Sequence, residues 1–161
     1  MLDSRTRTLV TANKVLTAIG YAMYPLLLVL LWLFDLPLLP ECIAVPAAGF
    51  VTLSAFRYIY NAPRPYELGG PMPPTGKATK GKSFPSRHTF CMFMIACTWM
   101  LFQPIVGAVL LACGFFMAYV RVKLGVHFLR DVVAGALCAI AFSLIGYLII
   151  PMLLKSTRIQ W

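Results

Sequence analysis

The sequence has few charged residues: Asp, Glu, Lys and Arg make up 12% of its 161 residues, against roughly a quarter in an ordinary soluble domain. Acidic residues are the scarcest, with five against 14 basic ones, which gives a formal net charge of +9. Hydrophobic residues make up 60%, more than the interior of so small a protein can hold. The composition therefore excludes an ordinary soluble domain and predicts a surface that is largely in contact with lipid.

The sequence also lacks the cysteine patterns of disulfide-bonded and zinc-binding proteins. Its five cysteines are an odd number, lie inside apolar stretches and form no Cys-x-x-Cys pair, so neither a disulfide framework nor a zinc ribbon is indicated. Only two histidines are present. We expect buried free thiols, no bound metal and no cofactor.

Long uncharged runs predict an all-α fold, an integral membrane helical bundle of about five transmembrane helices in a single domain, residues 1–161. About 20 helical residues at 1.5 Å each cover the ~30 Å hydrocarbon core. The second run reaches this length only if it continues to residue 60 with Arg57 turned inward or snorkelling. The expected spans are residues 15–34, 42–60, two helices within 89–120 that meet at Gln103-Pro104, and 132–154.

Residues 61–84 differ in composition, with five prolines and four glycines. Such a segment cannot be a helix or face lipid, and a loop of this length in a compact protein is usually functional. With five spans, the N-terminus, this loop and residues 121–131 share one face, which holds 12 of the 14 basic residues. Lys155 and Arg158 lie on the other face. We therefore expect residues 61–84 to be the catalytic loop.

The polar residues next to the expected helix ends suit phosphoryl transfer. Ionisable groups beside a transmembrane bundle are costly to place there and are functional by default. Guanidinium groups bind phosphate oxygens well, so Arg57, Arg64 and Arg121 could cradle a phosphoryl group. Lys77, Lys80, Lys82, Lys123 and Arg130 are expected to be solvated, and Tyr58, Tyr60 and Trp161 to lie at the membrane interface.

The two histidines fit divided roles in such a reaction. His127 and Asp131 are four residues apart and share a face if the last helix begins before His127. Asp131 could then accept the Nδ1–H bond and leave Nε2 free to attack phosphorus. His88 would protonate the departing lipid alkoxide. Because one imidazole must start neutral and the other charged, we expect a bell-shaped pH–rate profile.

Three motifs, Arg57-x6-Arg64-Pro65, Pro85-Ser86-Arg87-His88 and Arg121-x5-His127-x3-Asp131, resemble in order and spacing the signature motifs of the type 2 phosphatidic acid phosphatase superfamily. The resemblance implies a helical bundle and a metal-independent phosphatase that works through a phosphohistidine intermediate. It also implies the following roles: nucleophile His127, acid His88, orienting carboxylate Asp131, and a phosphate pocket of Arg57, Arg64, Ser86 and Arg121.

Three positions depart from the resembled pattern. The family usually has Lys at position 57, Gly at position 87 and Ser at position 120, where this chain has Arg57, Arg87 and Val120. Arg87 could add a phosphate contact or be turned away. Because all three proton-handling side chains are present, we expect an active hydrolase of phosphoric monoesters or diphosphates.

The sequence leaves the substrate and the acceptor open. Phosphatidic acid, phosphatidylglycerol phosphate and a polyprenyl diphosphate all fit a membrane lipid substrate, and nucleic acid does not. The alternatives are a lipid phosphotransferase and a non-catalytic subunit that binds lipid headgroups. We expect the plasma membrane as the location. The positive-inside rule places the basic face in the cytoplasm, whereas the resembled family usually has its site on the outer side, which we favour.

Overall fold

The structure is a computed structural model that describes residues 3–74 and 79–152. Within those ranges it contains helices and no strand, which confirms the all-α fold. The elements are α1 (Ser4–Leu33), α2 (Leu39–Tyr60), the 3₁₀ turn η1 (Pro65–Leu68), α3 (Arg87–Phe102), α4 (Pro104–Lys123), α5 (Leu129–Leu144) and a π-helical turn, η2 (Ile145–Ile149). Lys77, Lys155, Arg158 and Trp161 lie outside the described residues.

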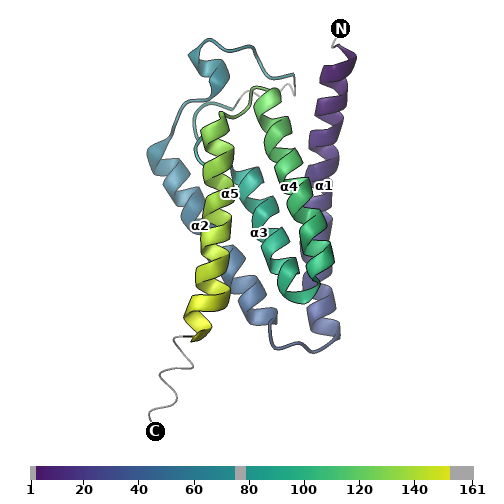
Figure 1. Ribbon diagram of the computed structural model, residues 1–161. Helices are drawn as coiled ribbons and strands as arrows, with labels where there is room; N and C mark the ends of the chain where they lie inside the picture. The colour runs from purple at the N-terminus through teal and green to yellow at the C-terminus, as the bar shows by residue number, and fades with distance from the viewer. Residues whose placement is uncertain (1–2, 75–78, 153–161) are drawn as a thin grey trace.

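Helix α3 is the centre of the bundle. It packs against all four other long helices, and many of its side chains are buried. On one side, its Met92 packs with Leu16 of α1 and Met117 of α4. On the other side, its Phe90 lies in a cluster with Leu53 of α2 and a residue of α5. Figure 1 shows α3 enclosed by the other helices.

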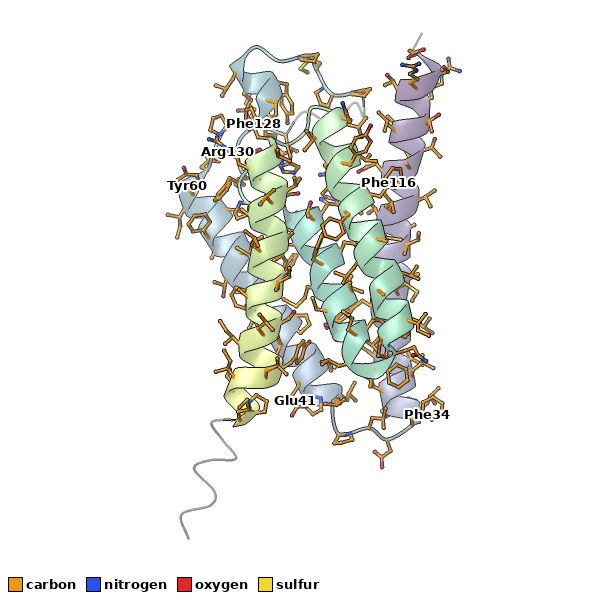
Figure 2. The ribbon with its side chains drawn as sticks, viewed as in Figure 1. Phe34, Glu41, Tyr60, Phe116, Phe128 and Arg130 are labelled. Carbon is orange, nitrogen blue, oxygen red and sulfur yellow. The ribbon has the colours of Figure 1, made fainter. Side chains whose placement is uncertain are left out.

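The outer faces of the bundle are apolar. Among the residues that the structure describes, four helical segments are long and hydrophobic enough to cross a membrane, and α3, with 16 residues, is a shorter apolar helix. Large hydrophobic side chains such as Phe116, Tyr60 and Phe34 are exposed around the bundle (Figure 2). An exposed apolar surface of this extent requires lipid as its solvent. The protein is therefore an integral membrane protein.

The connections gather at the two ends of the bundle. The N-terminus, the segment between α2 and α3 and the segment between α4 and α5 lie at one end, and the α1–α2 and α3–α4 connections lie at the other (Figure 1). Tyr58 and Tyr60 are exposed near the first end, as expected of interface residues. Lys80, Lys82, Lys123 and Arg130 are exposed as well.

Several helix boundaries differ from those expected. Helix α1 begins at Ser4 rather than residue 15, and α4 continues to Lys123, so Arg121 is in its last turn rather than in a loop. The segment 61–84 was expected to be free of helix, but Pro65–Leu68 forms a 3₁₀ turn whose first backbone N–H, on Arg64, donates to Glu67. The five cysteines are free as expected, but only Cys42 is buried.

The last helix begins after His127, not before it. Gly125 has φ of +67°, a conformation that favours glycine and ends the α4 turn. Asp131 then caps α5, because its Oδ2 accepts a hydrogen bond of 3.0 Å from the N–H of Phe128. A carboxylate at this position satisfies a free donor and interacts favourably with the helix dipole. His127 therefore lies in the α4–α5 connection rather than on the helix.

Candidate active site

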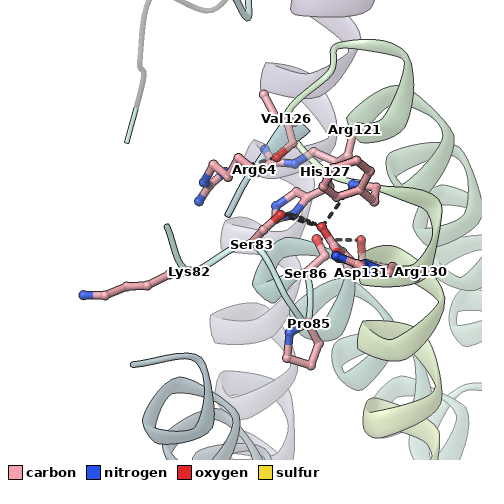
Figure 3. A network of polar contacts seen from close by, with 12 residues as sticks. Arg64, Lys82, Ser83, Pro85, Ser86, Arg121, Val126, His127, Arg130 and Asp131 are labelled. Atoms are coloured by element: carbon pink, nitrogen blue, oxygen red, sulfur yellow. Dashed lines mark hydrogen bonds and ion pairs between the residues drawn. The ribbon is translucent and has the colours of Figure 1, made fainter. Parts of the chain in front are cut away.

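His127 and Asp131 form a buried pair at the loop end of the bundle. His127 is 2% exposed and Asp131 is fully buried. The imidazole Nδ1 lies 3.4 Å from Asp131 Oδ2, and the hydroxyl of Ser83 donates to the same oxygen. Figure 3 shows this three-residue network, with Arg64 and Arg121 beside His127. The condition for a shared helix face, a last helix that begins before His127, is not met, but the carboxylate still meets Nδ1, which leaves Nε2 available.

Arg57 holds the loop that carries Ser83. Its guanidinium is buried in the last turn of α2, as expected for an arginine turned inward. It donates to the carbonyl of Ser83 at 3.2 Å and also to the carbonyls of Lys82 and Pro85. These bonds leave two of the five N–H donors of a guanidinium. Arg57 thus fixes the loop backbone directly beside the His127–Asp131 pair.

Arg64 ties the same loop to the α4–α5 connection. Its Nε donates to the carbonyl of Gly81 at 3.0 Å, and its Nη1 donates to the carbonyl of Val126 at 3.2 Å. Val126 immediately precedes His127, so this arginine bridges two segments far apart in the sequence. Glu67 supports the arrangement, because its Oε1 accepts from the backbone N–H groups of Arg64 and Gly81.

Arg121 connects three helices at the same end. The side chain is 9% exposed. Its Nη2 lies 3.2 Å from His88 Nδ1 on α3, and its Nη1 donates to Asn13 Oδ1 on α1 at 3.1 Å. Its Nε is buried without a hydrogen-bond partner. Arg121 thus lies between His88, one of the two expected catalytic histidines, and Asn13, which the sequence motifs did not indicate.

Ser86 and Arg87 point in different directions. Ser86 is fully buried; its N–H donates to the backbone carbonyl of Asp131 at 2.7 Å, and its hydroxyl accepts from Thr89. Arg87 is exposed and lies over the ring of Phe50, 5.6 Å from its centroid. Ser86 therefore joins the second and third motifs. Arg87 is turned toward α2 and away from the His127–Asp131 pair.

Burial controls the protonation of His127. Desolvation lowers the pKa of its imidazole to about 4, and the positive charges of Arg121 and Arg64 act in the same direction. The hydrogen bond and charge of Asp131 oppose this shift without reversing it. His127 is therefore neutral at physiological pH, the form in which a ring nitrogen carries a free lone pair.

An apolar groove leads to His88 from the side of the bundle. The cavity, about 510 Å³, lies among α1, α2 and α3, with Arg87 and His88 at its polar end. Its lining includes Tyr21 and Phe50, which are exposed on the outer faces of α1 and α2. The groove therefore opens sideways, toward the region that lipid occupies.

The motif residues thus meet at one end of the bundle, although they come from four segments of the chain. Sequence reasoning missed Ser83 and Asn13, which contact Asp131 and Arg121 directly. Ser83 is two residues before the second motif, and this proximity was the one signal for it. Among the described residues, no group of three or more His, Cys, Asp or Glu side chains is placed to hold a metal ion.

The fold and the site define an all-helical integral membrane protein with histidine, carboxylate and arginine side chains clustered at one end. A family model for the PAP2 superfamily matches residues 37–155, so the chain belongs to that superfamily, as the three motifs predicted. Among solved structures it resembles Aquifex aeolicus LpxE, with 27% sequence identity, a TM-score of 0.74, and coverage of 87% of this chain and 86% of that one. No curated protein matches. Family and fold together support a membrane phosphatase.

Proposed function

We propose that this protein is a metal-independent phosphatase that removes phosphate or diphosphate groups from a membrane lipid through a phosphohistidine on His127. The observation that carries the proposal is the apolar groove that ends at His88, beside the cluster of His127, Arg64 and Arg121. A lipid tail fits an apolar groove open to the bilayer, and its phosphate would then lie among the guanidinium groups.

In the first step, Nε2 of His127 attacks phosphorus and the bond to the lipid oxygen breaks. Asp131 keeps the proton on Nδ1 and stabilises the positive charge that develops on the ring. Arg64 and Arg121, with the remaining donors of Arg57, neutralise the charge on the equatorial phosphate oxygens. Ser86 joins the second and third motifs behind them. Arg87, at the polar end of the groove and turned toward Phe50, is placed to meet a headgroup rather than the reacting phosphorus.

His88 handles the proton of the leaving group. In the structure its Nδ1 faces the guanidinium of Arg121, a neighbour that disfavours a charged imidazole. A bound phosphate dianion would engage Arg121 and favour a protonated His88, which can then donate to the departing alkoxide. In the second step, water attacks the phosphohistidine, His88 accepts its proton, and inorganic phosphate leaves.

The proposal is tested by incubating purified protein, in detergent and with excess chelator, with a series of phosphorylated lipids. Released phosphate is measured for phosphatidic acid, phosphatidylglycerol phosphate, a polyprenyl diphosphate and a water-soluble phosphate ester. Release from at least one lipid with chelator present is expected. If no lipid is hydrolysed, the enzyme proposal is wrong; if phosphate moves to an added alcohol in preference to water, the protein is a phosphotransferase.

Filling the groove should impair long-chain substrates selectively. Ala47 lines the groove on α2 and is exposed, so Ala47→Trp adds bulk without disturbing the core. We expect kcat/KM for a long-chain lipid phosphate to fall by about tenfold or more, with little change for a soluble ester. Ala48→Trp, at an exposed neighbouring position that does not line the groove, is the matched control. Equal effects of both variants would argue against tail binding there.

The pH dependence should follow the lowered pKa of His127. Its imidazole is neutral above about pH 4 and charged below, and only the neutral form can attack. We expect kcat/KM to fall as the pH drops through about 4, not 6.5, and kcat to show a second limb at high pH, where His88 loses its proton in the complex with substrate. The profile is measured with two esters whose phosphate groups differ in pKa. A limb that moves with the ester reports the substrate, and a limb that stays in place reports the enzyme. An acid limb near 6.5 with both esters would contradict this assignment.

We also propose that the face with His127 is extracytoplasmic, at the plasma membrane, as the family resemblance implies. A cysteine introduced at Lys80, which is exposed in the loop, should react in intact cells with a membrane-impermeant thiol reagent. Labelling only after the cells are opened would place the site in the cytoplasm.

A further inference from the structure

Helix α1 contributes a polar side chain to the active-site end of the bundle. Asn13 lies on α1, before the residues that match the family model. It is partly buried, and its Oδ1 accepts a hydrogen bond from Arg121 Nη1 at 3.1 Å. The other terminal nitrogen of the same guanidinium lies 3.2 Å from His88 Nδ1. An amide on the first helix thus reaches the general acid of the proposed reaction through one arginine.

We propose that Asn13 is a positioning residue: it orients the guanidinium of Arg121 so that its free donors face the phosphate and its Nη2 faces His88. The inference rests on the proposed phosphatase function. A guanidinium is planar and rigid, so a bond that fixes one terminal nitrogen also fixes the direction of the other. Arg121 Nε is buried without a partner, and within the described residues the other side-chain hydrogen bond of this group is to His88, the residue that it has to face.

The amide of Asn13 carries no charge, and this affects how Arg121 can bind an anion. A carboxylate at the same place would also accept the hydrogen bond, but it would pair with the positive charge of Arg121. An amide orients the group and leaves its full charge for an anionic ligand. The side chain at position 13 thus controls two separable properties of Arg121, its direction and its charge.

A purely structural role, in which Asn13 attaches α1 to the bundle, predicts a different outcome. Apolar contacts already attach this helix, through Leu16 beside Met117 and Val120 and through Leu27 and Leu31 farther along. Loss of one partly buried amide should therefore leave α1 in place. If the role were structural, its replacement would lower thermal stability and leave the kinetic constants of the folded enzyme unchanged.

The experiment compares Asn13→Leu and Asn13→Asp with wild type in detergent, using a short-chain lipid phosphate for kcat and KM. Asn13→Leu removes the acceptor, and we expect kcat to fall by about 10²-fold, as for a misplaced catalytic group. Asn13→Asp keeps the acceptor and adds a negative charge, so KM should rise by about tenfold while kcat changes much less. Thr11→Val, at an exposed position of α1, is the control and should match wild type.

Thermal unfolding and calorimetric binding of inorganic phosphate complete the comparison. Asn13→Asp should weaken phosphate binding about tenfold, with melting temperatures close to wild type. If wild type hydrolyses no lipid but binds phosphate, and Asn13→Asp weakens that binding, the proposed function fails and the positioning role stands. If both variants keep wild-type kinetics and phosphate affinity, or change only in melting temperature, the positioning role is wrong. If wild type neither hydrolyses lipid nor binds phosphate, both proposals are wrong.

Discussion

Replacing His127 by alanine is expected to lower phosphate release by at least about 10⁴-fold, because the variant lacks the proposed nucleophile. The side chain is buried beside Asp131, so His127→Asn, which keeps a donor near that carboxylate, should be studied in parallel. Both variants should also fail to retain radioactive phosphate from a labelled substrate after rapid denaturation at alkaline pH, whereas wild type should retain it.

The matched control is His88→Ala. This variant lacks the proposed acid but keeps the nucleophile. Its kcat/KM, which reports the first step, should therefore fall strongly with lipid substrates and much less with an aryl phosphate, whose leaving group needs no proton. A His127 variant that turns over lipid at the wild-type rate, or an equal loss of kcat/KM for both substrates in the His88 variant, would contradict the division of roles.

Asp131→Asn is expected to lower kcat by about 10³- to 10⁴-fold, as reversal of a histidine tautomer does in other enzymes. Ser83, the N–H of Phe128 and His127 Nδ1 all contact one oxygen of this carboxylate, Oδ2. In either orientation the amide lacks the negative charge that stabilises the positive imidazole. Where its NH₂ occupies the Oδ2 position, Nδ1 must act as an acceptor, the proton moves to Nε2 and the attacking lone pair is lost.

Activity of Asp131→Asn is measured with a short-chain lipid phosphate, alongside thermal unfolding to show that the variant folds. Asp35→Asn makes the same chemical change at an exposed position in the α1–α2 connection, at the other end of the bundle, and should leave activity unchanged. Wild-type turnover by Asp131→Asn would exclude an orienting role for this carboxylate.

The helical fold was predictable because membrane spans require long uncharged runs. Each run in the sequence corresponds to a helix, and the Gln103-Pro104 turn separates α3 from α4 as expected. The exact ends were less predictable. Lys123 remains helical because a charged side chain is tolerated in the last turn of α4, and α1 starts well before its apolar run.

The residues of the three motifs were predictable as a group, because ionisable side chains cost free energy when they are placed beside lipid. Their partners were not. Asn13 is a common polar residue with no spacing signal, and Ser83 had only its proximity to the second motif; they contact the site because α1 and the loop fold against it. The three carbonyls to which Arg57 donates were also unpredictable, since every residue has a backbone carbonyl and no sequence pattern shows which ones a side chain will contact.

The short length of α3 has a consequence for the depth of the reaction. Its 16 residues and the 20 of α4 start from one tight turn, so α4 extends about 6 Å further toward the loop end. The central helix therefore begins below the level that α4 reaches at the loop end (Figure 1), and His88, the second residue of α3, lies below that level as well. A phosphorylated lipid would have to sink below the level of the surrounding headgroups to react. Bilayer thickness should then alter turnover even where the chemistry of the substrate is unchanged.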